Sequence, residues 1–310
     1  MAQKAVDDFK IADARSYDAH VGNFERFSAI LTAPFARRIV AMAKISTGQC
    51  ILDVGTGTAV VALEAAEATG GKGRCVGIDL SEKMIAAAKA SAERANLGSR
   101  IEFKVMDGES LEFEDSAFDV VVSLFALLHF PNPEIALKEM FRVLKPGGTL
   151  VVGVGSAPPW LSLTGFRHGL KLIPEIFATL RGRRLVAPKF LEQIVNGKIP
   201  ARDESEESPL ARAGRNRTRS VRLLIQSAGF ENLRQHWEGH RAILETPTDF
   251  WDIQRTFSSI ARKRLNDATP DQVGEVRAKF DAGCRKMLAH GGKLIYPVGA
   301  FFIAAQKPGR

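Results

Sequence analysis

The chain has 310 residues, of which 45% are hydrophobic, and 43 Lys and Arg against 35 Asp and Glu give a formal net charge of +8. This apolar fraction is typical of a globular protein and excludes a disordered, low-hydrophobicity chain. No apolar run is long enough to cross a bilayer, and no apolar signal region follows Met1. We therefore expect no transmembrane segment and a cytoplasmic location.

The cysteines and histidines indicate no disulfide and no metal site. Cys50, Cys75 and Cys284 are odd in number and unrelated in spacing, and the first two lie in or beside predicted strands, as core thiols do. His236 and His240 share one face of a predicted strand but stand well apart, and no third ligand has a suggestive spacing.

Part of the positive charge is concentrated in two runs, Arg181–Arg184 and Arg212–Arg222. Neither run carries the interleaved aromatic residues of a single-strand nucleic-acid platform. We interpret both runs as a solvated basic face and favour a small-molecule partner over nucleic acid. Peripheral contact with an anionic membrane and a homodimer both stay open.

Residues 11–45 are predicted to be helical, because aromatic and aliphatic side chains recur there at helical spacing. Pro34 is expected to divide the segment into two helices. Tyr17 and His20 are the better pocket candidates because each carries a polar group. Phe24 and Phe27 are equally suited to packing on a sheet.

A strand, a glycine turn and a helix follow one another from Cys50 onward. Gly55 and Gly57 permit backbone angles that a Cβ disfavours, and a helix beginning near Ala59 directs free N–H groups toward the same place. This arrangement predicts a cofactor cradle, in which a side chain at position 55 would block the cofactor and leave the fold largely intact.

The cradle differs from a dinucleotide site in two respects. A G-x-G-x-x-G pattern that starts at Gly55 would need glycine where Val60 stands. Asp53 beside the turn would repel a pyrophosphate. The same carboxylate suits a cationic ligand such as the ammonium and sulfonium groups of S-adenosylmethionine.

Four further strand-like segments follow at regular intervals and predict a doubly wound α/β fold. They are Arg74–Asp79, Ile101–Met106, Phe118–Ser123 and Leu144–Leu150. Asp79, at the tip of the second strand of such a sheet, is placed to accept the hydroxyls of a ribose.

With these motifs in order from Ile51 to Val154, the chain resembles the class I S-adenosylmethionine-dependent methyltransferases, in particular the ubiquinone/menaquinone-type branch. The resemblance implies a Rossmann-like, seven-stranded, mostly parallel sheet with an N-terminal helical lid. It also implies S-adenosyl-L-methionine as cofactor. One departure is Ala59, where the family usually has a third glycine, and we expect the extra methyl to be tolerated.

The resemblance and the strand ends together assign candidate site residues. Asp107 would accept the adenine amino group, as the matching family position does, and Met84 would give the adenine ring an apolar surface. The predicted cofactor-binding residues are Asp53, Gly55, Thr56, Gly57, Asp79, Leu80, Met84, Asp107, Gly108 and Ser123. The predicted catalytic residues are His129, Tyr17 and His20.

His129 is the one ionisable group in the loop after the fourth strand, and it admits two interpretations. It could act as a general base or orient an acceptor. Equally, it could cap the segment before Pro131. A base is needed only if the acceptor must lose a proton, because a sulfonium already has a good leaving group.

After the fifth strand, the chain becomes rich in large apolar side chains over Trp160–Leu180 and then polar and acidic over Asp203–Ser208. We interpret 156–214 as an inserted helical cover with a flexible loop. An apolar cover, including Trp160 and Phe166, favours a bulky lipophilic or aromatic acceptor. A second hydrophobic cluster or a dimer contact would explain the same composition.

The expected organisation is therefore a lid (1–45), a cofactor-binding core (46–155), the cover (156–214) and the remaining core (215–310). The predicted function is S-adenosylmethionine-dependent methylation of a small, apolar or aromatic molecule. Two alternatives are an RNA methyltransferase that uses the basic surface and a non-catalytic partner protein that binds the cofactor.

Overall fold

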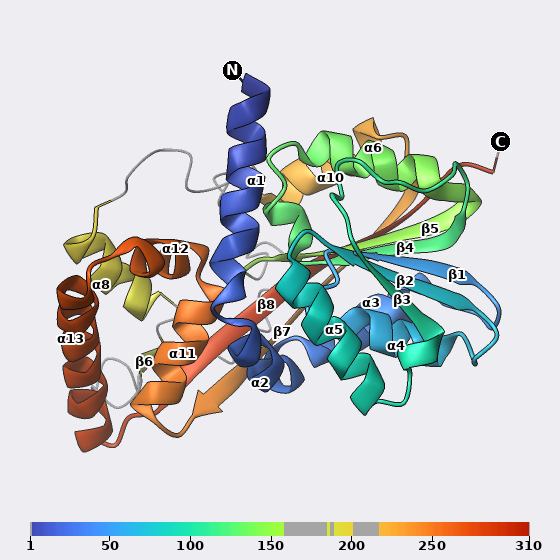
Figure 1. The fold of residues 1–310 in the computed structure, drawn as a ribbon. Helices are drawn as coiled ribbons and strands as arrows, with labels where there is room; N and C mark the ends of the chain where they lie inside the picture. Colours follow the sequence, from blue (N-terminus) through green and yellow to red (C-terminus); the bar gives the residue numbers. More distant parts are fainter. Residues whose placement is uncertain (1, 158–184, 187–188, 201–216, 310) are drawn as a thin grey trace. The chain divides into compact units, whose positions relative to one another are not determined.

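The computed structural model of the protein describes residues 2–157, 185–186, 189–200 and 217–309 (Figure 1). The chain forms two compact units. The core unit contains 1–156, 208–236 and 300–310, and the second unit contains 157–207 and 237–299. Much of the expected cover, including Trp160 and Phe166, lies outside the described residues.

The core unit is built on a sheet in which β3, β2, β1, β4 and β5 run parallel and β8 runs antiparallel to β5. β7 pairs with β8 on the far side. The strands are β1 (Cys50–Val54), β2 (Arg74–Asp79), β3 (Ile101–Val105), β4 (Phe118–Leu124), β5 (Leu144–Gly155), β7 (Glu231–Leu244) and β8 (Leu294–Gln306). This confirms the predicted Rossmann-like, mostly parallel sheet.

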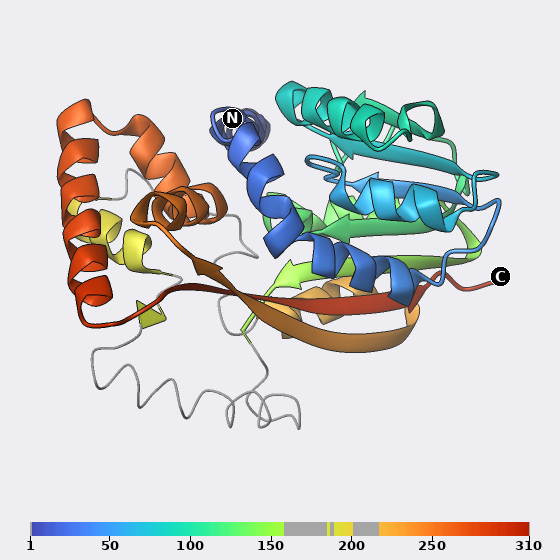
Figure 2. The same cartoon turned by 90° about the horizontal axis from the view of Figure 1, so that it is seen from below.

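Helices cover both faces of this sheet (Figures 1 and 2). The central strands β1 and β4 are almost entirely buried, as expected for strands covered on both faces. One face carries α3 (Ala33–Ala43), α4 (Val60–Ala68) and α5 (Glu82–Arg94). The other carries α6 (Pro133–Val143) and α10 (Arg217–Ser227), and the short turns η1 (Gly98–Arg100) and η2 (Ala126–Leu128) follow α5 and β4.

The N-terminal region forms three helices, namely α1 (Ala2–Asp18), α2 (Val21–Leu31) and α3. Pro34 lies in the first turn of α3, where its missing N–H costs nothing, so the predicted division at this proline is confirmed. A second break, between Asp18 and Val21, gives three helices where two were expected. Because α3 packs on α4, β4 and β5, it is a layer of the fold, whereas α1 contacts α5.

The second unit contains β6 (Leu185–Val186), α8 (Phe190–Lys198), α11 (Pro247–Phe257), α12 (Ser259–Asp267) and α13 (Pro270–Ala289). Thr269 begins α13 with a capping box. At α11 the cap is Thr246, because its hydroxyl accepts the N–H of Asp249, and Thr248 lies within the helix. Phe280 on α13 packs against Phe250 and Trp251 on α11.

The described part of the chain contains no helix that is long and apolar enough to cross a membrane. In the same residues, no cluster of three or more His, Cys, Asp or Glu is placed to hold a metal ion. All three cysteines are free thiols. Burial raises the pKa of Cys75, as expected for an inert core thiol.

Candidate functional site

The carboxyl ends of β1, β2, β3 and β4 meet at one edge of the sheet, because these neighbouring strands are parallel. This edge is where doubly wound sheets bind their ligands. The turns that leave these strands carry most of the residues that the sequence singled out.

The turn after β1 is anchored to β2 through the backbone. The N–H groups of Gly55 and Thr56 both donate to the carbonyl oxygen of Ile78, at 2.9 and 2.8 Å. Gly55 has φ +75°, and a Cβ built there would lie 2.2 Å from the Cβ of Ala126 on η2. A side chain at position 55 would therefore disrupt the packing of two turns, so the expectation of an intact fold was wrong.

Gly57 has the open position that a ligand cradle requires. Its φ is +54°, and a Cβ there would meet nothing within 4 Å. Its N–H donates to Oδ2 of Asp79 at 2.9 Å, which holds the first turn against the end of β2. The space above Gly57 is where a cofactor can approach the backbone closely.

Ala59, the residue where a glycine was expected, adopts the left-handed conformation with φ 74° and ψ 16°. It is fully buried and forms the N-cap position of α4, without a side-chain cap. The chain thus retains at this position the backbone geometry that glycine adopts most easily.

Asp53 is a buried acid at the end of β1 and is only 1% exposed. Its Oδ2 accepts a hydrogen bond from the Thr56 hydroxyl at 2.8 Å, while Oδ1 has no hydrogen-bond partner among the residues that the structure describes. Burial raises its pKa to about 7, a shift that the charge of Asp79 increases and the Thr56 hydroxyl and the nearby Ala62 N–H oppose. Such a carboxylate is stabilised by a cationic ligand, which fits an ammonium or sulfonium group.

Asp79 projects from the end of β2 and accepts two backbone N–H groups, from Gly57 and from Ser81 at 3.0 Å. Burial raises its pKa, and these hydrogen bonds together with the charge of His129 oppose that rise. Ser81 is the N-cap of α5, because its hydroxyl accepts the N–H of Met84 at 3.1 Å. The same hydroxyl donates to Asp18 of α1 at 2.8 Å.

Three of the remaining predicted cofactor-binding residues have limited access to solvent. Leu80, which lies between Asp79 and Ser81 in the sequence, is partly buried, and Met84 is only 4% exposed. Ser123 is fully buried, and its hydroxyl donates to the carbonyl oxygen of Val54 at 2.9 Å, which ties β4 to β1.

Asp107 lies in the turn after β3, where α1 meets it. Its Oδ1 accepts the N–H of Glu109 at 2.9 Å, and its Oδ2 accepts from Nζ of Lys10 at 2.6 Å. Lys10 also pairs with Glu109 at 2.8 Å, and the two acids raise its pKa against the opposing effect of burial. At Gly108, a Cβ would lie 2.7 Å from the ring of Phe130, so this glycine is needed for close packing.

His129 lies in a cluster with two side chains of α1, Tyr17 and Asp13. The Tyr17 hydroxyl is 2.9 Å from Nε2 of His129 and 3.1 Å from Nδ1. Oδ2 of Asp13 is 3.1 Å from Nδ1. Asp13 is buried and His129 is about one-third exposed, with a side-chain exposure of 33%. An imidazole held by a buried carboxylate can accept a proton and keep the resulting charge stabilised.

This cluster is attached to the cofactor cradle through η2. The N–H of His129 donates to the carbonyl oxygen of Ala126 at 2.8 Å, and Ala126 is the residue that packs on Gly55. His20, the third predicted catalytic residue, is buried at the start of α2, where its side chain makes no capping hydrogen bond.

Sequence reasoning missed three polar residues of this site, Lys10, Asp13 and Glu109. Lys10, Asp13 and Tyr17 are spaced i, i+3 and i+7, so they share one face of α1. That spacing was a usable signal. Glu109 had no comparable signal, since its partners, Lys10 and Asn132, come from distant parts of the chain.

Comparison with known proteins places this geometry in context. A family model described as "Methyltransferase domain" matches residues 52–152. The demethylmenaquinone methyltransferase of Staphylococcus carnosus is 30% identical over 217 residues, which cover 68% of this chain and 81% of that protein. The demethylmenaquinone methyltransferase of Bacillus cereus is 33% identical over 174 residues, which cover 56% and 70%.

Solved structures share the fold at low identity. Phosphoethanolamine N-methyltransferase 2 of Haemonchus contortus matches with a TM-score of 0.53 and 18% identity, covering 97% of this chain and 60% of that one. The [4+2]-cyclase SpnF matches with a TM-score of 0.50 and 22% identity, covering 89% and 81%. Because the fold carries both reactions, it does not by itself identify the chemistry.

Proposed function

Because the chain belongs to the class I S-adenosylmethionine-dependent methyltransferases, in the menaquinone-type branch, we propose that it methylates a small aromatic acceptor beside His129. The observation that carries this proposal is the attachment of the Asp13–His129–Tyr17 cluster to the turn that packs on Gly55. A base in this cluster would lie beside the proposed cofactor cradle.

The proposed cofactor site uses the cradle as it stands. S-adenosylmethionine, when bound, supplies an electrophilic methyl group on a sulfonium. Asp53 would stabilise the positive charge of the cofactor, and the open space at Gly57 would admit the part of the cofactor that contacts the backbone. Asp79 would accept the ribose hydroxyls, since each carboxylate oxygen retains a lone pair beyond the backbone N–H that it already accepts.

The adenine assignment of Asp107 carries a further requirement. Because Lys10 occupies Oδ2 of Asp107 and the Glu109 N–H occupies Oδ1, an adenine amino group would have to share one of these oxygens or displace Lys10. Displacement of Lys10 from Asp107 is compatible with α1 acting as a lid. Lys10 would keep its ion pair with Glu109, and α1 would stay attached at this edge.

The proposed acceptor chemistry follows from the tautomer of His129. With Nδ1–H donating to Asp13, Nε2 is the acceptor, and it takes either the Tyr17 hydroxyl or a hydroxyl of the substrate. Removal of a phenolic proton by Nε2 makes an aromatic ring nucleophilic at oxygen and at the adjacent carbon. The partly exposed edge of His129 gives a substrate access to this nitrogen.

The relatives favour a ring acceptor, since two of them are named for the methylation of demethylmenaquinone. A substituted hydroquinone fits both the proton chemistry of His129 and this likeness. The RNA alternative rests on net charge alone, whereas the non-catalytic alternative offers no reason for a base held by a buried carboxylate.

The test is a methylation assay with purified full-length protein, S-adenosylmethionine and a short-chain naphthohydroquinone under reducing conditions, read by mass spectrometry. We expect product heavier by one methylene unit, with stoichiometric S-adenosylhomocysteine. Total RNA in the same assay is expected to acquire no methyl label. Methylation of RNA alone would overturn the proposal in favour of the first alternative, and cofactor binding without turnover on any acceptor tested would favour the second.

A further inference from the structure

A pocket of about 520 Å³ lies within the core unit, away from the methyl-transfer site. Thr149 pairs with Val120, and Val120 pairs with Ile51 near the start of β1, so the pocket lies at the amino ends of the parallel strands. The cofactor cradle is at their carboxyl ends. The pocket residues are Ala43, Lys44, Gln49, Thr149, Asn232, Leu233, Arg234 and Gln306.

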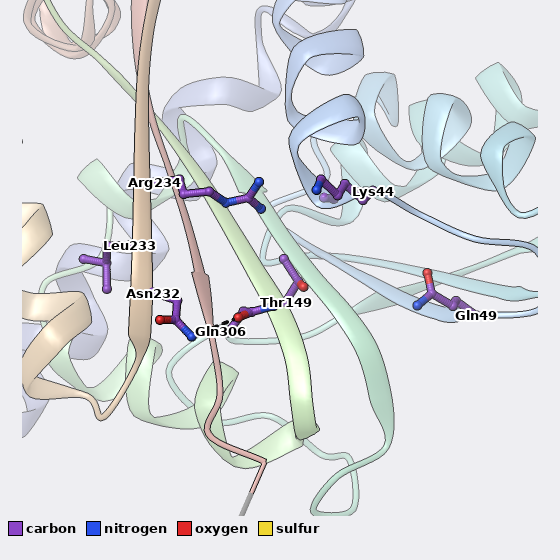
Figure 3. Close-up of a pocket in the computed structure, with 8 residues that line it drawn as sticks. Lys44, Gln49, Thr149, Asn232, Leu233, Arg234 and Gln306 are labelled. Atoms are coloured by element: carbon purple, nitrogen blue, oxygen red, sulfur yellow. Dashed lines mark hydrogen bonds between the residues drawn. The ribbon is translucent and has the colours of Figure 1, made fainter.

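Two cations from distant segments line this pocket. Lys44 ends α3, and Arg234 lies near the start of β7. In Figure 3 their charged groups extend toward each other, with Thr149 between them. Among the described residues, no ion pair or hydrogen bond joins either cation to another side chain, and no acidic residue lines the pocket.

Of the residues that the structure describes, Lys44 and Arg234 are the only charged ones that line the pocket. Two such charges without a counter-ion are expected to attract an anion.

The other polar residues add hydrogen-bond donors. Gln49 uses its Oε1 to accept the Ser46 N–H, and Gln306 uses its Oε1 to accept from Asn232, so both amides keep their NH₂ groups for a ligand. Thr149 adds a hydroxyl. A set of two cations, two amides and one hydroxyl suits the several acceptor oxygens of a phosphate group.

The backbone at the pocket supports a functional interpretation of these side chains. Lys44 has φ 53° and Asn232 has φ 54°, both in the left-handed region. Asn adopts this conformation readily, but Lys does so at a cost of about 1 kcal/mol, which glycine at this helix end would avoid. We interpret a lysine retained at this cost as one whose side chain is used.

We propose that this pocket binds a small phosphate-type oxyanion between Lys44 and Arg234, at the edge of the sheet opposite to the methyl-transfer site. Free phosphate and a phospholipid headgroup share this chemistry. The proposal is independent of the acceptor and of the roles of Asp53, Asp79 and His129.

The experiment titrates the full chain with inorganic phosphate, followed by isothermal calorimetry and by phosphorus NMR line broadening. The double variant Lys44→Gly/Arg234→Gln removes both cations, and glycine at 44 keeps the left-handed backbone. We expect saturable binding by the natural chain and a loss of about 10-fold or more in the double variant, since charge-assisted hydrogen bonds are removed. Cofactor affinity should stay unchanged.

The matched control is Lys89→Gln/Lys138→Gln, which removes two exposed lysines of α5 and α6 and gives the same net charge. It should bind phosphate as the natural chain does. Equal weakening in both double variants, or no saturable binding of phosphate in any arm, would overturn the proposal. Flotation with phosphatidylglycerol and phosphatidylcholine vesicles distinguishes the sources: binding confined to the anionic vesicles, lost in Lys44→Gly/Arg234→Gln, assigns the oxyanion to a lipid headgroup.

Discussion

The two halves of the proposed methyl-transfer site are held in different ways. The proposed cofactor cradle is held mainly by the backbone, through the N–H groups of Gly55 and Thr56 on Ile78 and of Gly57 on Asp79. The proposed acceptor half is held mainly by side chains, since α1 brings Asp13 and Tyr17 to His129. The cradle forms within one strand–turn–helix segment and its neighbouring strand, whereas the acceptor half joins residues more than a hundred positions apart.

This difference predicts how each half responds to substitution. Backbone hydrogen bonds persist when side chains change, so cradle variants should alter the cofactor affinity through the particular atom removed. In the acceptor half, the contacts are made by the side chains themselves. The loss of one of them should therefore reduce turnover and leave the cradle intact. The predictions below test this separation.

The largest expected effect is the loss of turnover in His129→Ala. A positioned general base contributes about 10²–10⁴-fold to rate, so we expect kcat to fall within this range. Cofactor affinity, measured by calorimetry, should change by less than about twofold because the cradle does not depend on the imidazole. Asp13→Asn should lower kcat less, since the amide can still hold the ring but cannot stabilise its positive charge.

The affinity for the cofactor separates a chemical role of His129 from a structural one, because only a structural role should change it. If His129→Ala weakens the cofactor as much as it slows turnover, the two halves are not separate.

The next effect is the loss of cofactor affinity in Asp79→Ala. The ribose hydroxyls would lose a charged acceptor, which costs about 1–3 kcal/mol. Asp79 also accepts the Gly57 and Ser81 N–H groups, so the melting temperature should fall as well. Asp79→Asn is the control, since it keeps an acceptor oxygen with a smaller loss of affinity. An unchanged dissociation constant in Asp79→Ala would remove the ribose assignment.

Gly57→Ala tests whether the open space at this turn is the cradle. The left-handed backbone makes alanine cost about 1–2 kcal/mol of stability, but no protein atom lies within 4 Å of the new methyl. We expect a folded variant whose cofactor affinity falls at least as far as its stability. Gly55→Ala offers the contrast, because its methyl would meet Ala126 and should lower stability first. Normal cofactor binding by Gly57→Ala would place the cradle elsewhere.

The pH dependence of cofactor binding tests Asp53. With its pKa raised to about 7, Asp53 is neutral at pH 6 and ionised at pH 8, so affinity for a cationic ligand should rise by up to about tenfold between them. The stability of the free protein changes with pH in the opposite direction. Because the folded pKa lies above the ordinary value, the stabilisation is complete below pH 4 and is lost as the pH rises through about 7.

Asp53→Asn should remove both of these dependences. The two opposite slopes make the test specific, since a general loss of structure would give slopes of the same sign. If the cofactor affinity of the natural chain does not change between pH 6 and pH 8, the ionisation of Asp53 does not contribute to cofactor binding.

The same difference in construction explains what could be predicted from the sequence. The order of strands and the turn at Gly55 and Gly57 follow from local periodicity and turn chemistry, and the structure confirms them. The partners of His129 do not, because no local pattern states that Asp13 will meet it. Ser123 was assigned from its place at a strand end, but burial directs its hydroxyl to Val54.

The division of the chain shows the same limit. Residues 237–299, which include part of β7 and the start of β8, were grouped with the core, yet they form a compact unit with 157–207. Gln254 on α11 holds the N–H of Leu191 on α8 at 2.9 Å, a contact across more than sixty residues. Long-range contacts of this kind have no signature in spacing or composition.

The smallest expected effect is that of Ala59→Gly, which restores the usual glycine at this turn. Relief of the left-handed strain gains about 1–2 kcal/mol, while glycine loses about 0.5–1 kcal/mol through its freer unfolded chain and about 0.8 kcal/mol from one buried methyl. These terms nearly cancel, so we expect the free energy of unfolding to change by less than about 1 kcal/mol. Cofactor affinity should change by less than about twofold, because Ala59 is fully buried and faces no ligand. Denaturant unfolding and calorimetry on the same preparation measure both. A marked gain in affinity would mean that the alanine methyl distorts the cradle. The backbone of the cradle would then depend on its side chains, although its hydrogen bonds are made by the backbone.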